Sequence, residues 1–345
     1  MLDDLKVIHE RDTQDALGIA ERQWQQLELE YDFAVEQPPV NARNIVYAGM
    51  GGSALAALVS GVWPGYTVPF EICRNYDIPA YVSADTYFIA SSYSGNTEET
   101  LSALAQAEVR GAQIAVIAGG GQLADIARAK QYPLVVLPPA GQPRYAVLYG
   151  LNALLTLLEK AGLAGNTGAT HELRTASSFL KEAVLPWTAT VPANDNTAKQ
   201  IAREVVGKSA VIYAGPKLYP AAYKWKIGFN ENAKHIAWVN QYPEFNHNEF
   251  MGWTKQPVDK PYTVIDLRSN LEHEQIRKRF VVSERLLSGL RPEPIVVEAQ
   301  GATLLEQLLW TIALGDFVTI YTALLNGLNP APVDLIEKFK QELNR

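Results

Sequence analysis

Short apolar runs and helical patterns alternate along the first half of the chain. The runs are rich in β-branched and aromatic residues, as buried strands are. Most of the runs are followed by a stretch whose apolar residues have helical spacing. Strands are predicted at 44–48, 67–72, 86–91, 113–118 and 133–137, and helices at 53–61, 97–109, 122–130 and 145–161. Such alternation is typical of a parallel sheet with helices on both faces. The first half is therefore predicted to form an α/β domain.

The second half repeats the start of this pattern. Residues 209–215 parallel residues 44–49 in their order of apolar and aromatic positions, and a helical stretch follows each run. Further strands are predicted at 262–266 and 294–298, and further helices at 271–289, 302–327 and 332–343. The chain is therefore predicted to contain two copies of one α/β fold.

A break at residues 165–168 and a polar loop at 186–196 separate the two halves. The helix expected between them, over 169–185, would be the connector. The predicted parts are an N-terminal domain of residues 1–165, a connector of residues 166–197 and a C-terminal domain of residues 198–345. Apolar positions among charges at 11–34 predict one amphipathic helix that covers the first domain or a partner subunit.

Two loops of the first half follow predicted strands and precede predicted helices. We call residues 49–53 the glycine loop and residues 92–97 the hydroxyl loop. At such positions the free N–H groups and the dipole of the helix favour an anion. The hydroxyl loop adds Ser92, Ser94 and Thr97, whose hydroxyls can donate hydrogen bonds to phosphate oxygens. Together the two loops predict a site for a small phosphorylated ligand.

The glycine loop alone has other interpretations. Gly49, Gly51 and Ala54 fit the dinucleotide fingerprint, with Glu71 placed for a ribose contact. A tight turn without any ligand is the plainest alternative. The hydroxyl loop favours phosphate, because a dinucleotide site does not require it. The three glycines at 119–121 follow another strand and are interpreted as a flexible turn.

Composition and charge limit the class of protein. The 345 residues are 48% hydrophobic and 19% charged, as in globular chains. A net charge of −7 argues against a nucleic-acid-binding surface, and the single cysteine, Cys73, excludes a disulfide framework within the chain. The first residues show no apolar signal region, and we found no apolar run of membrane-spanning length. We therefore expect a cytoplasmic protein without nucleic-acid or membrane partners.

The candidate chemistry of the second half lies at residues 231–253. Glu231 ends a helical pattern and is a candidate base, although an exposed surface carboxylate is the simpler interpretation from the residues alone. His247 lies among polar neighbours in an aromatic frame and is a candidate acid/base or a structural histidine. A metal site is a weaker alternative. Glu231 and His235 are four residues apart, and Glu249 follows His247 closely, but no standard zinc spacing is present.

Several of these segments resemble known families. Residues 49–54 and 91–100 resemble the phosphosugar-binding loops of sugar isomerase (SIS) domains. Residues 230–234 and 243–249, followed by Gly252-Trp253, resemble the bifunctional phosphoglucose/phosphomannose isomerase family. The resemblance extends from about residue 43 to the C-terminus. It implies two SIS-type domains, each a flavodoxin-like parallel sheet between two helical layers.

The resemblance also implies roles for individual residues. Glu231 would transfer the proton, Arg144 would stabilise negative charge on an enediolate, His247 from the neighbouring subunit would open the sugar ring, and Lys338 would assist ring opening. Arg144 otherwise has two interpretations, since its side chain can extend to solvent or point at a ligand anion. The phosphate and sugar cradle would comprise Gly51, Gly52, Ser53, Ser92, Ser94 and Thr97.

The implied activity is the isomerisation of hexose 6-phosphates through a cis-enediol, by a homodimer without cofactor or metal. Ala331 stands where family members usually carry a threonine; a small residue there would leave room for the enediol to rotate, so that both epimers form. One alternative is a phosphosugar-binding regulator without chemistry, which would not need Glu231, His247 and Lys338. The other is a nicotinamide-dependent dehydrogenase, which would bind a dinucleotide.

Overall fold

The computed structural model describes residues 1–165, 168–255 and 261–343. Contacts along the chain divide it into two compact units. The first unit is Arg22–Leu180, and the second unit combines Met1–Glu21 with Lys181–Arg345. Residues 1–21, which the sequence pattern placed in the first domain, thus belong to the same unit as the C-terminal half. Residues 166 and 167 of the predicted break lie outside the described residues.

The described part of the first unit holds a six-stranded sheet with the order β1-β6-β5-β4-β2-β3. All neighbouring strands are parallel except β1 and β6, which are antiparallel. The strands are β1 (Phe33–Val35), β2 (Asn44–Ala48), β3 (Phe70–Cys73), β4 (Thr86–Ser92), β5 (Gln113–Ala118) and β6 (Leu134–Val136). The predicted parallel α/β sheet is confirmed.

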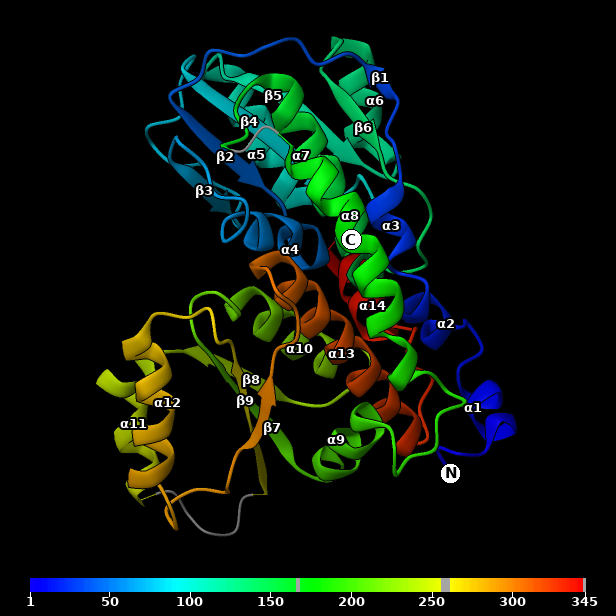
Figure 1. Cartoon of the computed structure of the whole chain (residues 1–345). Coiled ribbons are helices and arrows are strands. Elements are labelled where there is room, and N and C mark those ends of the chain that lie inside the picture. Colours follow the sequence, from blue (N-terminus) through cyan, green and yellow to red (C-terminus); the bar gives the residue numbers. More distant parts are fainter. Residues whose placement is uncertain (166–167, 256–260, 344–345) are drawn as a thin grey trace. The chain divides into compact units, whose positions relative to one another are not determined.

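Helices cover both faces of this sheet (Figure 1). Alternate residues of β2 and β4 point to opposite faces, so Phe88 packs with Leu104 and Leu123 on one face, whereas Tyr87 packs with Leu154 on the other. The helices of the unit are α3 (Gln25–Glu28), α4 (Gly51–Ser60), α5 (Glu98–Val109), α6 (Gly121–Lys130) and α7 (Val147–Ala161). Helix α8 (Ala169–Ala183) contains the boundary between the units.

The described part of the second unit holds a four-stranded, fully parallel sheet with the order β10-β9-β7-β8. Its strands are β7 (Ser209–Ala214), β8 (Ala237–Gln241), β9 (Tyr262–Arg268) and β10 (Ile295–Glu298). Its helices are α1 (Leu5–Arg11), α2 (Ala16–Glu21), α9 (Thr197–Val205), α10 (Tyr219–Glu231), α11 (Glu249–Gly252), α12 (Glu274–Leu286), α13 (Leu304–Leu325) and α14 (Asp334–Leu343). The prediction of a second parallel α/β unit is confirmed.

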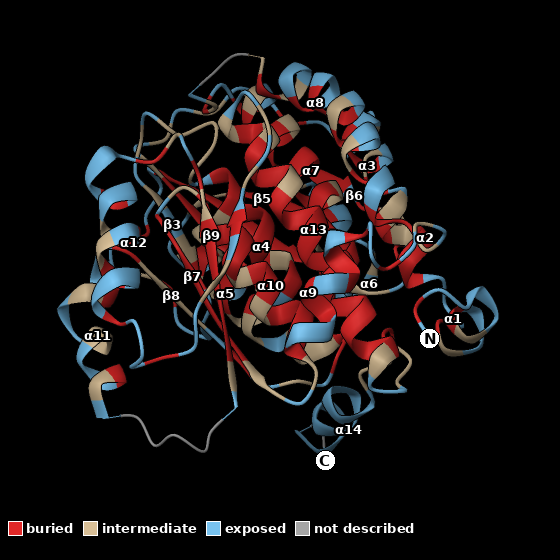
Figure 2. Ribbon diagram, turned by 60° about the horizontal axis from the view of Figure 1, so that its bottom comes forward, coloured by how far each residue is buried: buried red, intermediate tan, exposed pale blue. Residues whose placement is uncertain are grey.

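Helix α13 is the central helix of the second unit. It starts at a capping box formed by Thr303 and Glu306, and it is buried along nearly its whole length (Figure 2). By length and hydropathy α13 could cross a membrane, so the expectation that no apolar run reaches that length is wrong. In the structure, however, 89% of its most apolar window is buried inside the protein. A helix that is apolar all round and surrounded by other elements is a core helix.

The prediction of a single amphipathic helix over 11–34 is also wrong. The carboxylate of Asp12 accepts hydrogen bonds from the N–H groups of Ala16 and Leu17, each at 2.8 Å, and so begins α2 as a new helix. Helix α3 and strand β1 then follow within the same stretch. Strand β8 was not predicted at all.

Candidate functional site

The hydroxyl loop connects β4 to α5 and is held by its own side chains. Ser92 is buried, and its Oγ lies 2.8 Å from Oγ1 of Thr97 and accepts a hydrogen bond from the N–H of Gly95 at 3.0 Å. Ser94 is exposed, and its Oγ accepts from the N–H of Asn96 at 3.3 Å. Ser92 thus stabilises the conformation of the loop, while Ser94 and Thr97 carry the hydroxyls that a ligand can reach.

The glycine loop lies directly beside the hydroxyl loop, because β2 and β4 are neighbouring parallel strands. Oγ of Ser53 accepts a hydrogen bond from the N–H of Tyr93 at 3.1 Å. The hydroxyl of Tyr47 donates to the carbonyl oxygen of Ser53 at 2.8 Å. The two predicted ligand loops are therefore joined at the carboxyl edge of the sheet, next to the N-termini of α4 and α5.

The three-glycine segment at 119–121 supports the hydroxyl loop from its other side. A Cβ on Gly95, whose φ is +71°, would lie 1.7 Å from the carbonyl oxygen of Gly120. The N–H of Gln122 donates to Oδ1 of Asn96 at 3.0 Å, and the N–H of Leu123 donates to the carbonyl oxygen of Gly95 at 2.9 Å. The segment is thus packed tightly against residues 94–96, a role that its composition did not indicate.

Arg144 lies in the short 3₁₀ helix η1 (Pro143–Tyr145), which packs on the glycine loop. A Cβ on Gly52 would approach the carbonyl carbon of Pro143 to 2.7 Å, so only glycine fits there without movement of that backbone. The Arg144 side chain is 1% exposed, and its guanidinium lies 4.6 Å from the centre of the Tyr145 ring. Extension to solvent, one of the two interpretations of Arg144, is therefore wrong.

In the second unit, Glu231 is the last residue of α10 and is half-buried. Three contacts fix the end of α10 on α13. Lys224 forms a buried ion pair with Asp316, Nε1 of Trp225 donates to the Thr311 carbonyl at 2.7 Å, and Nδ2 of Asn232 donates to Oγ1 of Thr319 at 2.9 Å. The position of Glu231 is thus set by the core helix of the unit.

Ala331 and Lys338 lie on either side of the start of α14. Ala331 is buried, and its N–H donates to Oδ1 of Asn329 at 3.1 Å, while Nδ2 of Asn329 donates to Oγ1 of Thr13 at 2.8 Å. Asn329 thus closes the turn with its amide oxygen and holds the N-terminal segment at Thr13 with its amide nitrogen. Lys338 is exposed on α14, none of whose residues is buried.

His247 is exposed at the end of the 3₁₀ helix η3 (Glu244–His247), which follows β8. Phe245 anchors η3, because its buried ring lies 4.4 Å from that of Tyr213 on β7. Helix α10 connects the parallel strands β7 and β8 and runs in the opposite direction to them. Glu231, at the end of α10, therefore precedes the start of β8, whereas His247 follows the end of β8. The five residues of β8 span roughly 13 Å. Glu231 and His247 of one chain therefore lie toward opposite edges of this sheet.

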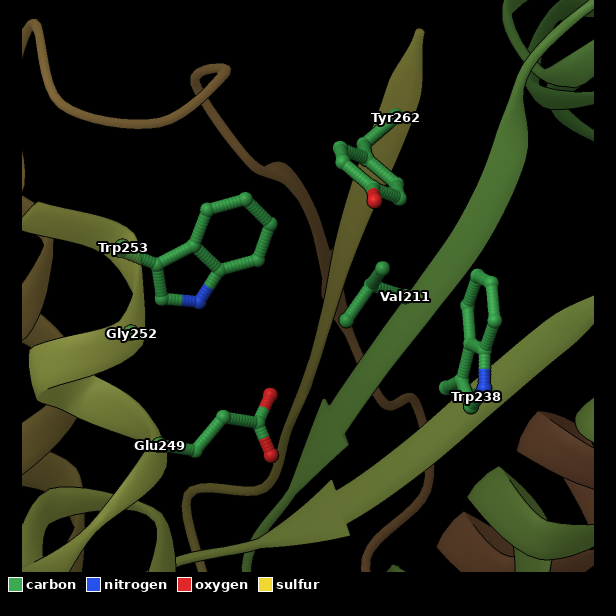
Figure 3. A pocket seen from close by; sticks show the side chains of 6 residues that line it. All are labelled: Val211, Trp238, Glu249, Gly252, Trp253 and Tyr262. Carbon is green, nitrogen blue, oxygen red and sulfur yellow. The ribbon is translucent and has the colours of Figure 1, made fainter. Parts of the chain in front are cut away.

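A pocket of about 200 Å³ lies on the face of the second sheet beside α11 (Figure 3). Glu249 points into it, and its carboxylate accepts hydrogen bonds from the Tyr213 hydroxyl and, at 2.6 Å, from Nδ2 of Asn240. Burial and the adjacent carboxylate raise the pKa of Tyr213, so its phenol keeps the proton that it donates. Glu249 thus ties the segment that carries His247 to β7 and β8. The lining residues are Val211, Trp238, Glu249, Gly252, Trp253 and Tyr262, and none of them is a predicted site residue.

The metal alternative gains no support. Over residues 1–165, 168–255 and 261–343, no group of three or more His, Cys, Asp or Glu side chains could hold a metal ion. The carboxylate of Glu249 already accepts the hydrogen bonds from Tyr213 and Asn240.

Comparisons with known proteins show which sequences and folds this chain is similar to. Residues 194–343 match the family model described as "Bacterial phospho-glucose isomerase C-terminal SIS domain". A bifunctional phosphoglucose/phosphomannose isomerase of Aquifex aeolicus is 30% identical over 335 residues, which are 96% of this chain and 99% of the relative. A D-glucosamine-6-phosphate 4-epimerase of Sulfolobus acidocaldarius is 33% identical over 216 residues, or 62% of this chain and 65% of the relative.

Solved structures share the fold. A glucose-6-phosphate isomerase-like protein from Thermus thermophilus aligns over 99% of this chain and 98% of its own, with a TM-score of 0.68 and 19% identity. A phosphosugar isomerase-like protein from Clostridium difficile aligns over 92% of this chain and 94% of its own, with a TM-score of 0.65 and 13% identity. At these identities the likeness concerns the fold alone.

Ser94 and Thr97 of the hydroxyl loop give a test of the cradle. We expect Ser94→Ala combined with Thr97→Ala to weaken the binding of fructose 6-phosphate by about 100-fold or more, since each of the two lost hydrogen bonds to a charged group is worth about 1.5–3 kcal/mol. Isothermal titration calorimetry measures the change. The matched control is Ser102→Ala with Thr175→Ala; these residues lie on α5 and α8, and their hydroxyls donate to the backbone carbonyls of Tyr76 and His171. Equal affinities of both double variants would remove the hydroxyl loop from the site.

Proposed function

Because this chain belongs to the bifunctional phosphoglucose/phosphomannose isomerase family, we propose that it interconverts glucose 6-phosphate and mannose 6-phosphate with fructose 6-phosphate. The observation that carries the proposal is the similarity to the Aquifex relative over 96% of the chain, which extends through both units. The joined glycine and hydroxyl loops add support. They present hydroxyls and helix N-termini together, which suits a dianionic phosphate.

In the proposed reaction, Glu231 takes the proton from C2 of the open-chain aldose, the electrons of that C–H bond form the C1–C2 double bond, and the electron pair of the C1 carbonyl moves to O1, which gives a cis-enediolate. The hydroxyl proton of O2 then passes to O1, so that the carbonyl forms at C2, while the Glu231 carboxyl group returns its proton to C1. The Arg144 guanidinium stabilises the negative charge of the enediolate. The phosphate is held by Ser53, Ser94 and Thr97. No step requires a cofactor or a metal.

Ring opening is assigned to Lys338 and to His247 of a second copy. The topology of the second sheet supports the second copy, since Glu231 and His247 of one chain lie toward opposite edges of that sheet. His247 is exposed, so its side chain can reach a ligand that its own chain does not hold. We therefore propose a homodimer whose active sites each use residues from both subunits.

The direct experiment is to supply fructose 6-phosphate and to quantify glucose 6-phosphate and mannose 6-phosphate separately by NMR. We expect both products. Binding of fructose 6-phosphate without any product would favour the alternative function, a phosphosugar-binding regulator. Absence of binding as well would reject the phosphosugar assignment.

The role of Glu231 is tested by Glu231→Gln, which keeps the shape of the side chain but cannot accept the proton. We expect kcat to fall by about 10²–10⁴-fold, which is the usual contribution of a positioned base, with affinity for the sugar phosphate retained. Steady-state kinetics and calorimetry measure the two quantities. Glu274→Gln, an exposed glutamate of α12, is the control. A Glu231→Gln enzyme with normal turnover would require a different base.

Sharing of the site between subunits is tested by mixing two inactive variants, Glu231→Gln and His247→Ala. In a mixed dimer one site would hold both native residues. A 1:1 mixture should therefore recover about a quarter of the native activity, because half of the dimers are mixed and one of their two sites is intact. Mass spectrometry of the dimers verifies that subunits exchange. No recovery despite exchange would place Glu231 and His247 of one chain in the same site.

We propose that the small side chain of Ala331 leaves the room that tolerance for both epimers requires. Ala331→Thr adds a hydroxyl, so we expect both products to persist with an efficiency changed by about 2–10-fold, the value of one neutral hydrogen bond of about 0.5–1.5 kcal/mol. Ala331→Gln fills the space and should suppress mannose 6-phosphate formation selectively. The ratio of the two products measures the effect, and thermal unfolding checks that each variant folds. An unchanged ratio in a folded Ala331→Gln enzyme would reject the role of this residue.

A further inference from the structure

Lys234 connects two segments of the second unit that are far apart in the sequence. Its Nζ lies 3.2 Å from the carbonyl oxygen of Asn232, 3.0 Å from that of Asn329 and 3.2 Å from that of Pro330. An ammonium group has three N–H donors, and each of these carbonyls can accept one. The side chain therefore bridges the end of α10 to the turn that leads into α14.

The backbone at Lys234 is unusual as well. Its φ is +53°, in the left-handed region that few residues other than glycine adopt. This conformation turns the chain between α10 and β8, where the N–H of His235 donates to the carbonyl of Phe229 at 2.9 Å. A lysine in this conformation, rather than the glycine that the turn favours, indicates that its side chain is required there.

The two bridged segments carry proposed active-site residues. Asn232 follows Glu231 directly, and its own amide is fixed to Thr319 on α13. Asn329 and Pro330 precede Ala331 and the helix α14, which carries Lys338. Because no residue of α14 is buried, the packing of its own side chains contributes little to its position. The turn at 329–331 and the groups that hold it therefore decide where α14 begins.

The electrostatics of this region favour a cation. The C-terminal ends of α10 and α13 lie on the same side of the second sheet, since both helices return from the carboxyl ends of parallel strands. Helix C-termini carry partial negative charge and unsatisfied carbonyl groups. Of the three carbonyls that the Lys234 ammonium contacts, that of Asn232 belongs to the C-cap of α10, and those of Asn329 and Pro330 lie in the turn that follows α13.

We propose that Lys234 is a positioning residue that holds Glu231 in register with Ala331 and Lys338. This inference rests on the proposed isomerase function for its catalytic meaning, whereas the bridge itself is independent of that function. A lysine that only stabilised the fold would change the unfolding temperature. A positioning lysine changes turnover and the order of α14 in the folded protein.

The experiment compares Lys234→Met with Lys217→Met in the full chain. Methionine keeps a long flexible side chain and removes the ammonium. Lys217 is the matched control, because its Nζ also donates to a backbone carbonyl of the second unit, that of Leu271 at 2.5 Å. For Lys234→Met we expect kcat for fructose 6-phosphate to fall by about 10²-fold, the usual effect of a 1 Å misplacement, with KM changed less than about 3-fold.

Amide hydrogen exchange measured on peptides from α14 gives a readout that does not depend on activity. We expect faster exchange across Asp334–Leu343 in Lys234→Met and native exchange in Lys217→Met. Lys234→Arg keeps the charge but not the compact tripod of donors, so it should restore the protection of α14 and kcat only in part. Unchanged kcat in a folded Lys234→Met enzyme would overturn the positioning role, as would equal losses in the Lys217→Met control.

The failure of this inference can be told from the failure of the proposed function. If the native protein does not isomerise fructose 6-phosphate, the proposed function fails, and hydrogen exchange alone then decides whether Lys234 holds α14. If the native protein is active and α14 exchanges at the native rate in Lys234→Met, the proposed function stands and the bridge carries no positioning role.

Discussion

Parallel pairing of strands is the constraint on which the rest of this structure depends. Two parallel neighbours require a helix that runs back across the sheet, and so each connection separates the residues at the end of a strand from those at the end of the following helix. In the second unit this rule places Glu231 before β8 and His247 after it. The proposed active site, which uses both residues, would therefore draw them from two copies of the chain.

The same constraint creates two electrically different kinds of sheet edge. At the carboxyl edge of the first sheet, the glycine and hydroxyl loops precede helix N-termini, whose N–H groups favour an anion. At the amino edge of the second sheet, the Lys234 ammonium contacts the carbonyl of Asn232 at the C-cap of α10 and that of Asn329 in the turn after α13. The proposed phosphate cradle and the lysine bridge thus lie at different edges of parallel sheets.

Local pattern predicted the buried elements well and the peripheral ones poorly. The central strands β2, β4, β5 and β7 are buried on both faces, so they form nearly continuous apolar runs, and their predicted bounds lie within a residue or so of the structure. Strand β8 is an edge strand with partly exposed residues, and its composition of Ala, Trp, Val, Asn and Gln gave no such run. The stretch 11–34 had helical periodicity, but the cap at Asp12 divides it.

The sequence by itself determined the residue types of the candidate site and the class of fold, because motif composition and hydrophobic period are local properties. It indicated the glycine and hydroxyl loops and gave Arg144, Glu231 and His247 as candidates, whereas Lys338 was assigned only through the resemblance to the family. Only the tertiary structure decided which segments meet: residues 119–121 against the hydroxyl loop, Pro143 against Gly52, and Lys234 against Asn329, 95 residues away. Those contacts join segments that are distant along the chain, and the path of the backbone between them, rather than any local pattern, brings them together.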